Sequence, residues 1–335
     1  MKATEPDQQT TARKPRHGAR QDFIAKNFGV LSISVVFVVL FAFFSLQTDA
    51  FFTSNNLVNV LRQVAPTVVV AMAMTFVITT GAIDLSVGSI VGLTAAALAI
   101  LAESGNPAVA LVLTLLIGAG IGAINGALTA YGKLQSFIVT LAALTAVRGV
   151  ALLITDGYST PISSSFLLPF GNGKLLGLYT PTWLAMLTVL GAWYVFTQTR
   201  FGRYIVAVGS NAESLRRSGV DIRKIQMAAL TLTGLFAAIA GILTATRLAS
   251  GSSNSGTLFE LEVITAVVLG GTSLMGGRGS IVGSAIGALT LGVISNGLVL
   301  LRVDVYWVPI VQGTILVVAI FANSKIFSRI AGQQQ

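Results

Sequence analysis

The feature that most restricts the fold of this chain is a series of long windows almost free of charge. A helix of roughly 20 residues crosses about 30 Å of hydrocarbon, and the 335-residue sequence holds ten windows near that length. They are residues 27–48, 63–83, 85–102, 107–131, 134–155, 181–199, 226–246, 263–277, 280–301 and 305–324. The window 263–277 is short and rich in glycine and serine, so it is expected either to span the membrane or to form a re-entrant segment. The sequence predicts an all-α polytopic membrane protein with about ten transmembrane helices.

The composition excludes most other classes of protein. Hydrophobic residues make up 54% of the chain and charged residues only 10%, against about a quarter in soluble domains. This balance argues against a soluble enzyme, a disordered chain and a nucleic-acid binder. The chain has no cysteine, and its one histidine, His17, lies in a polar tail. Disulfides, thiolate sites and a histidine-based metal site in the body are therefore excluded.

Basic residues in the loops predict the orientation. With both ends in the cytoplasm, sixteen lysines and arginines fall inside and four outside, as the positive-inside rule requires. We therefore expect cytoplasmic termini and a location in the bacterial plasma (inner) membrane. The expected organisation is an N-terminal tail over 1–26, one membrane domain over 27–324 and a C-terminal tail over 325–335. Within the membrane domain, residues 200–225 form the main cytoplasmic loop.

Small residues recur in two patterns. The sequence Gly-Ser-Ile-Val-Gly stands at 88–92 and again at 279–283, each time at the opening of a span. The recurrence indicates either an internal duplication or a shared small-residue composition. Glycines also follow one another at intervals of four, at 118, 122 and 126 and at 279, 283 and 287. This spacing lets helices approach closely, either within one subunit or between two copies.

A few polar residues near or inside the spans are candidates for a transport pathway or gate. Arg148 costs about 2.5–3.5 kcal/mol at a helix centre, so it is expected to pair with Asp156 or to line a polar pathway. Asp84 is expected to cap the next helix or to act in a gate, and it is interpreted as the only acid near a span interior. That interpretation counts against a proton-coupled carrier. The other candidates are Ser86, Asn125 and Asn296.

The cytoplasmic loop contains the pattern of a short capped helix. Asn211 is a favourable N-cap for residues 212–217, and Gly219 is placed to end the helix in the left-handed conformation. Glu213, Arg216 and Arg217 would offer charges to a partner. The loop is interpreted as a docking site or, more simply, as an ordinary positive-inside loop. We call residues 212–217 the capped helix.

Sequence motifs for catalysis are absent. Gly132-Lys133 and Gly173-Lys174 are each followed by leucine, so there is no phosphate-binding P-loop. No catalytic residues, metal ligands or cofactor-binding residues are predicted. If ATP drives this protein, a partner chain must hydrolyse it.

Several segments together resemble a known family, the permease subunits of bacterial ABC importers for monosaccharides. The resemblance is to the ribose-type branch within the wider branched-chain amino acid and sugar permease superfamily. It extends over about residues 51–324. The segments are NNL at 55–57, GAIDLSVGS at 81–89, FIVTL at 137–141, RG at 148–149, GRY at 202–204, GSN at 209–211, SG at 218–219, AVVLGGTSL at 266–274 and GGRG at 276–279.

The resemblance implies a set of partners. They are a second copy of the chain, ATPase subunits that bind ATP and Mg²⁺, an extracytoplasmic sugar-binding protein and membrane lipid, with no nucleic acid. It also implies that the segment from Asn211 to Gly219 is the coupling helix that enters a groove of the ATPase. The family often has Ala-Ala-Arg where this chain has Ser214-Leu215-Arg216, which leaves the detailed contacts open.

The resulting expectation is a permease subunit for a ribose-like monosaccharide, working as a homodimer. One alternative is a permease of the same superfamily for a nucleoside, a purine or an amino acid. A carrier that works without ATP is another, and a polytopic enzyme is a third. The capped helix counts against a carrier, and the lack of histidine, cysteine and acid pairs counts against an enzyme.

Overall fold

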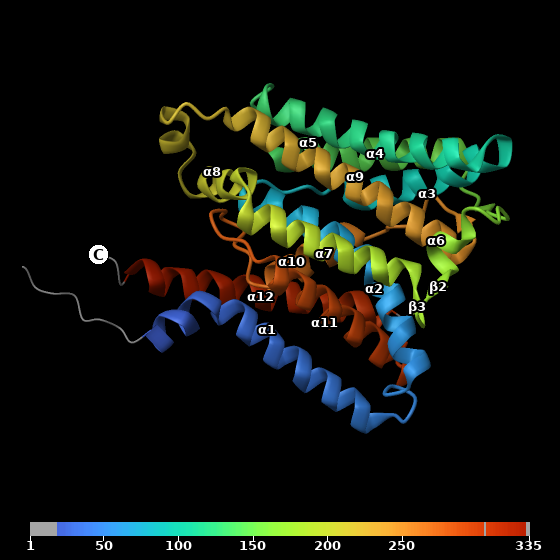
Figure 1. Cartoon of the computed structure of the whole chain (residues 1–335), viewed down its shortest axis with the longest axis horizontal. Helices are drawn as coiled ribbons and strands as arrows, with labels where there is room; N and C mark the ends of the chain where they lie inside the picture. The colour runs from blue at the N-terminus through green and yellow to red at the C-terminus, as the bar shows by residue number, and fades with distance from the viewer. Residues whose placement is uncertain (1–18, 305, 333–335) are drawn as a thin grey trace, which may run out of the picture.

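The computed structural model describes residues 19–304 and 306–332, and they form a bundle of helices (Figure 1). The helices are α1 (Ala19–Gln47), α2 (Ser54–Thr79), α3 (Val87–Ser104), α4 (Pro107–Ala130), α5 (Ser136–Thr155), α6 (Leu168–Asn172), α7 (Thr180–Gln198), α8 (Arg200–Arg217), α9 (Ile222–Leu248), α10 (Phe259–Leu269), α11 (Ile281–Leu300) and α12 (Trp307–Gly332). Two-residue strands pair as β1 (Thr160–Pro161) with β4 (Ser250–Gly251) and as β2 (Lys174–Leu175) with β3 (Leu178–Tyr179).

Each of the ten charge-poor windows coincides with a helix, but the helices differ in length. Six described helices are long and apolar enough to cross a membrane, namely α1, α2, α4, α5, α9 and α11. The 11 residues of α10 extend about 16 Å, so this helix does not cross the bilayer alone. The count of ten spans and the orientation of the termini remain predictions.

The boundaries expected for the two tails fall inside helices. Helix α1 begins at Ala19, within the expected N-terminal tail, and α12 continues to Gly332, within the expected C-terminal tail. Residues 1–18 and 333–335 of these tails lie outside the described part of the chain.

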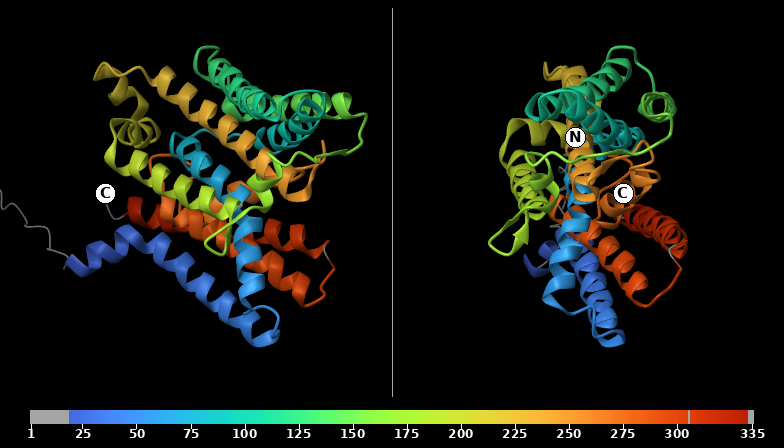
Figure 2. Two further views of the ribbon diagram at one scale, coloured as in Figure 1. Left: turned by 45° about the vertical axis from the view of Figure 1, so that its right-hand side comes forward. Right: turned by 90° about the vertical axis from the view of Figure 1, so that its right-hand side faces the viewer.

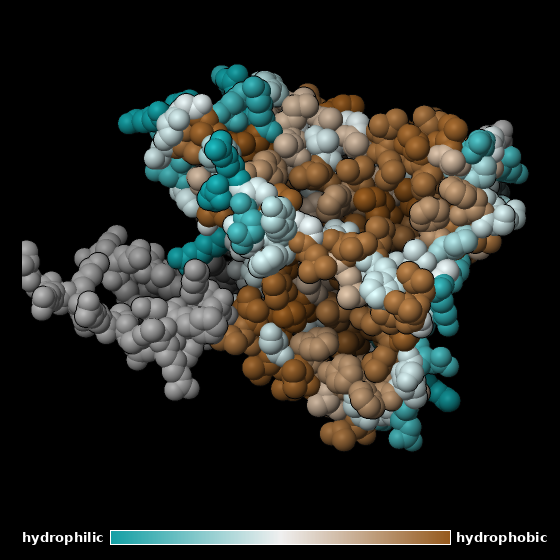
Figure 3. Space-filling model, in the orientation of Figure 1, coloured by the Kyte–Doolittle hydropathy of each residue, from teal (hydrophilic) through white to brown (hydrophobic). Residues whose placement is uncertain are grey.

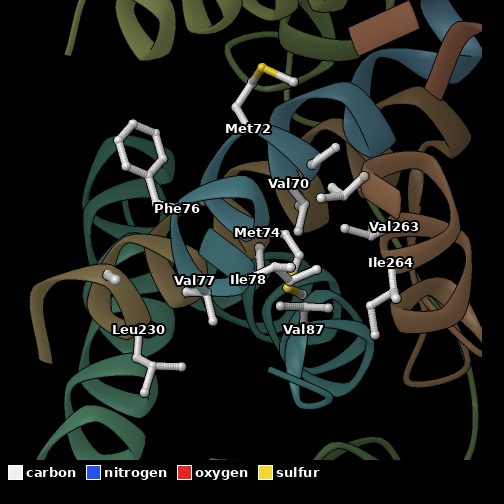
Figure 4. Close-up of a cluster of buried hydrophobic side chains, with 14 of the residues drawn as sticks. Val70, Met72, Met74, Phe76, Val77, Ile78, Val87, Leu230, Val263 and Ile264 are labelled. Carbon is white, nitrogen blue, oxygen red and sulfur yellow. The ribbon is translucent and has the colours of Figure 1, made fainter. Parts of the chain in front are cut away.

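The surface and the core agree with a membrane environment. A hydrophobic band crosses the middle of the molecule, and polar residues gather at the two ends of its long axis (Figure 3). Large apolar side chains are exposed on α4, α5 and α12, for example Leu116, Leu153 and Val317. Inside, Val70 and Met74 of α2 pack with Val87 of α3 and Val263 of α10 (Figure 4). The core therefore lies around α2.

The glycines spaced by four residues bring helices together within the chain. A Cβ atom at Gly118 would lie 2.5 Å from that of Ala238, and one at Gly122 would lie 2.5 Å from the carbonyl oxygen of Leu230. Both contacts join α4 to α9, which lie side by side in Figures 1 and 2. Glycines at 283 and 287 meet α10 in the same way. The prediction of close packing within one subunit is confirmed.

Two turns of the backbone have the same form. Gly81 follows α2 with φ +84°, and Gly271 follows α10, 190 positions later, with φ +89°. Each donates its N–H to the carbonyl three residues back at 2.9 Å, and the next residue donates to the carbonyl five residues back, at 3.3 and 3.2 Å. Helix α11 ends in the same way at Arg302 and Val303, so the form of the turns does not separate an internal duplication from shared local composition. The loop after the second turn meets the first turn, because Gly277 donates to the carbonyl oxygen of Thr79 at 2.9 Å.

Candidate functional site

The chain between α2 and α3 is extended and passes through the interior of the bundle (Figure 1). Here Oδ1 of Asp84 accepts hydrogen bonds from the backbone N–H of Ser86 at 3.0 Å and from its hydroxyl at 2.6 Å. Oδ2 of Asp84 accepts from the hydroxyl of Thr233, on α9, at 2.5 Å. The residue at the N-cap of α3 is Ser86. Although Ser86 holds the N-cap position, the Asp84 carboxylate accepts a free backbone N–H at the start of α3, as expected of a capping group, and it also connects the turn to α9.

Three of the pathway candidates belong to one network. The side-chain amide of Asn125, on α4, donates to the hydroxyl of Ser86 at 2.9 Å. The network thus consists of Asp84, Ser86, Asn125 and Thr233, and we call it the Asp84 network. Each of the four is at most 2% exposed. It holds α4, α9 and the start of α3 together, and it is closed to solvent in this conformation.

Arg148 does not pair with Asp156. Its guanidinium donates instead to the carbonyl oxygens of Ser253, Ser255 and Gly256, at 2.5, 3.4 and 3.3 Å. These carbonyls belong to the segment between β4 and α10. Asp156 is exposed and ends α5 in the left-handed conformation, with φ 48°. The half-buried arginine therefore fixes an interrupted stretch of backbone inside the bundle.

Two glutamates in the first turn of α10 were missed by the sequence analysis. Glu260 is 8% exposed, and Glu262 accepts from the hydroxyl of Thr67 at 2.9 Å. Carboxylates are favourable at a helix N-terminus, because they face its free N–H groups. The interpretation of Asp84 as the only acid near a span interior is wrong. The glutamates were missed because each window was defined to begin after a charged residue, so this span was taken to start at residue 263. With acids present near a span interior, a lack of acids no longer counts against proton coupling.

Asn296 lies apart from the other candidates. It exchanges two side-chain hydrogen bonds with Asn56, at 2.9 and 3.0 Å. Asn56 stands in the first turn of α2, whereas Asp84 follows the last turn. The pair joins α11 to α2, and the structure does not bring it into the Asp84 network.

The geometry predicted for the capped helix is confirmed. Helix α8 breaks at Asn211, with φ −159° and ψ 88°, and Oδ1 of that residue accepts from the backbone N–H of Ser214 at 2.9 Å. Gly219 has φ +80° and donates its N–H to the carbonyl oxygen of Arg216 at 3.0 Å. The capped helix therefore has both of its expected ends.

The charges of the capped helix pair with one another. Glu213 forms ion pairs with Arg216 and, at 3.2 Å, with Arg217. All three side chains are at least half exposed, so the pairs contribute little to stability. They remain available to a partner, while their own pairing fixes their arrangement beforehand.

The part of α8 before the break reaches the end of α2 and the loop between α10 and α11. A Cβ atom at Gly209 would collide with the carbonyl oxygen of Thr79 and the backbone N of Gly277. The hydroxyl of Ser210 also lies 3.5 Å from the carbonyl oxygen of Gly277. Only a residue without a side chain allows this approach. The capped helix is thus the direct continuation of a helix that touches the turns before α3 and α11.

No group of three histidine, cysteine, aspartate or glutamate side chains able to hold a metal ion occurs among the described residues. The chemistry that the structure places in the interior is hydrogen bonding and charge, arranged around breaks in the helices.

Comparison with known proteins places the chain in a family. Residues 56–320 match the family described as "Branched-chain amino acid transport system / permease component". The ribose import permease of Escherichia coli K12 is 43% identical, covering 87% of this chain and 92% of that protein. The ribose import permease of Bacillus subtilis is 40% identical, with coverages of 86% and 90%. The xylose transport system permease of Escherichia coli K12 is 32% identical, with coverages of 92% and 95%.

None of the solved structures matches the chain. The membrane-crossing helices and the relatives agree on a multi-pass protein of the plasma membrane. Since the matches cover most of its length, the chain belongs to the branched-chain amino acid transport system permease family.

Proposed function

We propose that this chain is the transmembrane subunit of an ATP-driven importer for a monosaccharide of the ribose class. Two copies form the translocation pathway, and separate ATPase subunits bind ATP and Mg²⁺. A sugar-binding protein outside the membrane delivers the substrate. The family and the ribose and xylose permeases among the relatives support this class of transporter.

The observation that carries the proposal is the connection from the capped helix to the interior. Six residues are too few to form a stable helix alone, so docking into an ATPase groove would give this element its order. The preceding part of α8 contacts Thr79 at the end of α2 and Gly277 in the loop before α11. A movement of the docked helix would therefore act on the segments that lead into α3 and α11.

The interior candidates act in this proposal as elements of a gate. The Asp84 network is buried, so it does not line an open channel in this conformation. It holds the start of α3 against α4 and α9, and Arg148 holds the segment before α10. When the turns move, these contacts would rearrange between two states. The two states of the dimer would then differ in which side of the membrane the pathway faces.

The test compares proteoliposomes that contain this chain alone with proteoliposomes that also contain the ATPase and the binding protein. We expect ribose uptake only with all three components and ATP, and no ATP hydrolysis by the chain alone. Concentrative uptake by the chain alone would instead establish a carrier. A second set of vesicles supplied with nucleosides, purines or leucine, each with its own binding protein, would reveal a different substrate class.

A further inference from the structure

Two buried polar atoms near the start of α10 have no hydrogen-bond partner. They are the hydroxyl oxygen of Ser253, which is fully buried, and Oε2 of Glu260, whose residue is 8% exposed. Buried polar groups are nearly always hydrogen-bonded, so each unpaired one requires an explanation. Both belong to the neighbourhood of Arg148, which binds the carbonyl of Ser253.

Arg148 supplies donors at the same place. A guanidinium carries five N–H donors, and three of the hydrogen bonds that Arg148 makes go to backbone carbonyls of residues 253–256. Two N–H donors therefore remain. Arg148 and Glu260 lie close enough for their charges to interact. They do not form an ion pair, since the ion pairs among the described residues all join residues between 213 and 224. The two opposite charges are thus near each other without direct contact.

Two glycines of α3 place both side chains against one helix face. A Cβ atom at Gly88 would collide with Oε2 of Glu260, and one at Gly92 would lie 2.9 Å from Nη1 of Arg148. Positions four apart on one helix face are separated by about 6 Å along the axis. The carboxylate and the guanidinium therefore face adjacent turns of α3, so that a group placed between them would contact both.

The site lies level with the middle of α2, a helix long enough to span the membrane, and at the edge of a helix face. Glu262, two residues after Glu260, contacts Thr67, which stands midway along the 26 residues of α2. Arg148 is half-buried, and its neighbour Gly149 faces open space. A charge directed at lipid at this depth is costly. This edge of α5 is therefore expected to meet a polar pathway.

We propose that Arg148, Ser253 and Glu260 form a subsite that binds a hydroxyl group of a neutral polyhydroxy ligand inside the membrane. The inference rests on the proposed function, under which the ligand is a monosaccharide. A sugar hydroxyl accepts from the guanidinium and donates to the carboxylate at once, which matches the unused atoms on both sides. Because the two side-chain charges cancel, a neutral ligand leaves the site balanced, whereas an anion or a cation would not.

The experiment measures uptake in proteoliposomes that hold the complete importer with its binding protein. The variants are Glu260→Gln and Ser253→Ala, and the substrates are ribose and a set of monodeoxy riboses. Glu262→Gln is the matched control, because that half-buried glutamate in the same turn of α10 already has Thr67 as partner. We expect Glu260→Gln to reduce ribose uptake about tenfold and Ser253→Ala about threefold, as for a lost hydrogen bond to a charged or neutral group.

The decisive readout is the deoxy sugar that lacks the recognised hydroxyl. The wild type should transport this analogue more slowly than ribose, and the two variants should slow it no further. Stimulation of ATP hydrolysis by the loaded binding protein should stay within about twofold of the wild type, because the capped helix is untouched.

Several results would overturn the subsite. One is an equal loss for ribose and for every deoxy sugar, and another is an equal loss in Glu262→Gln, since each indicates a structural defect. Uptake of leucine that depends on Glu260 would show that the site binds a zwitterion and not a neutral polyhydroxy ligand. If Glu260→Gln does not assemble, Ser253→Ala decides by the same set of sugars. Failure of the wild type to move ribose with ATP would refute the proposed function, whereas normal uptake by both variants would refute only the subsite.

Discussion

Helices α4 and α9 form a regular pair, whereas the region around α3 and α10 consists of short helices joined by extended segments. In the first region, glycines on one helix meet the backbone of the other along the pair, and the Asp84 network adds only one polar contact from each helix. In the second, Asp84, Arg148 and Glu262 bond to residues from distant parts of the chain. Because polar contacts can exchange partners more readily than close-packed backbones can separate, we infer that α4 and α9 form a fixed frame. The interrupted region is then the part that moves.

The largest effect is expected from breaking the frame. Gly122→Val would place a branched side chain against the backbone of Leu230, 2.5 Å from its carbonyl oxygen. Overpacking of a tight interface costs about 1–3 kcal/mol or more, so folded protein in the membrane should fall at least tenfold. Detergent extraction followed by size-exclusion chromatography measures this. Gly120→Val, where a Cβ atom meets nothing within 4 Å, is the control and should leave the yield unchanged. Equal yields of both variants would show that the pair is not rigid.

The second prediction concerns the link from the capped helix to the interrupted region. Gly219→Val would force a β-branched residue into a left-handed conformation with φ +80°, which such residues avoid. The helix would lose its end and its position, so binding of the ATPase and ATP-driven uptake should fall together, by about tenfold. Membrane insertion should be normal, because no span is touched.

Copurification of the ATPase and uptake in vesicles give the two readouts for Gly219→Val. Gly191→Val on α7, where the added atoms meet open space, is the control. Normal ATPase binding in Gly219→Val, together with harmless deletion of residues 212–217, would show that this loop is only a topological signal.

The capped helix and the close approach of a helix to the glycines at 118, 122 and 126 could be predicted from local patterns, whereas α9 as the partner of α4 could not. Glycine spacing, hydrophobic windows and the residues Asn211 and Gly219 act over a few positions. The contacts of the interrupted region could not be predicted from local patterns. Thr233 is one hydroxyl in an apolar helix, and its bond to Asp84 joins residues 149 positions apart. Glu260 and Glu262 carry the charges that ended the search window, although helix packing buries the first and half-buries the second.

The third prediction tests whether the Asp84 network moves. Asp84→Asn keeps one acceptor oxygen, so either Ser86 or Thr233 loses its partner and an amide replaces a charge. The yield of protein should remain within about twofold. Uptake should fall about fivefold, because a hydrogen bond to a charged group would be lost in only one of the two conformations of the gate. Initial uptake rates measure this effect. Asp221→Asn, at the exposed start of α9, is the control. Unchanged uptake would place the Asp84 network in the fixed frame.

The smallest effect is expected at Asn296, which lies outside both the frame and the Asp84 network. Asn296→Ala removes two hydrogen bonds to Asn56, and each neutral bond contributes about 0.5–1.5 kcal/mol. The temperature of half-unfolding should fall slightly, and the uptake rate should change by less than about twofold. A double-mutant cycle with Asn56→Ala, followed by thermal unfolding in detergent, isolates the pair. Because Asn56 also donates to the carbonyl oxygen of Phe51 at 2.9 Å, the double variant should be little worse than Asn56→Ala alone. A large loss of uptake without loss of stability would instead show that Asn296 belongs to the moving region. Helix α11 would then be assigned to the part that moves.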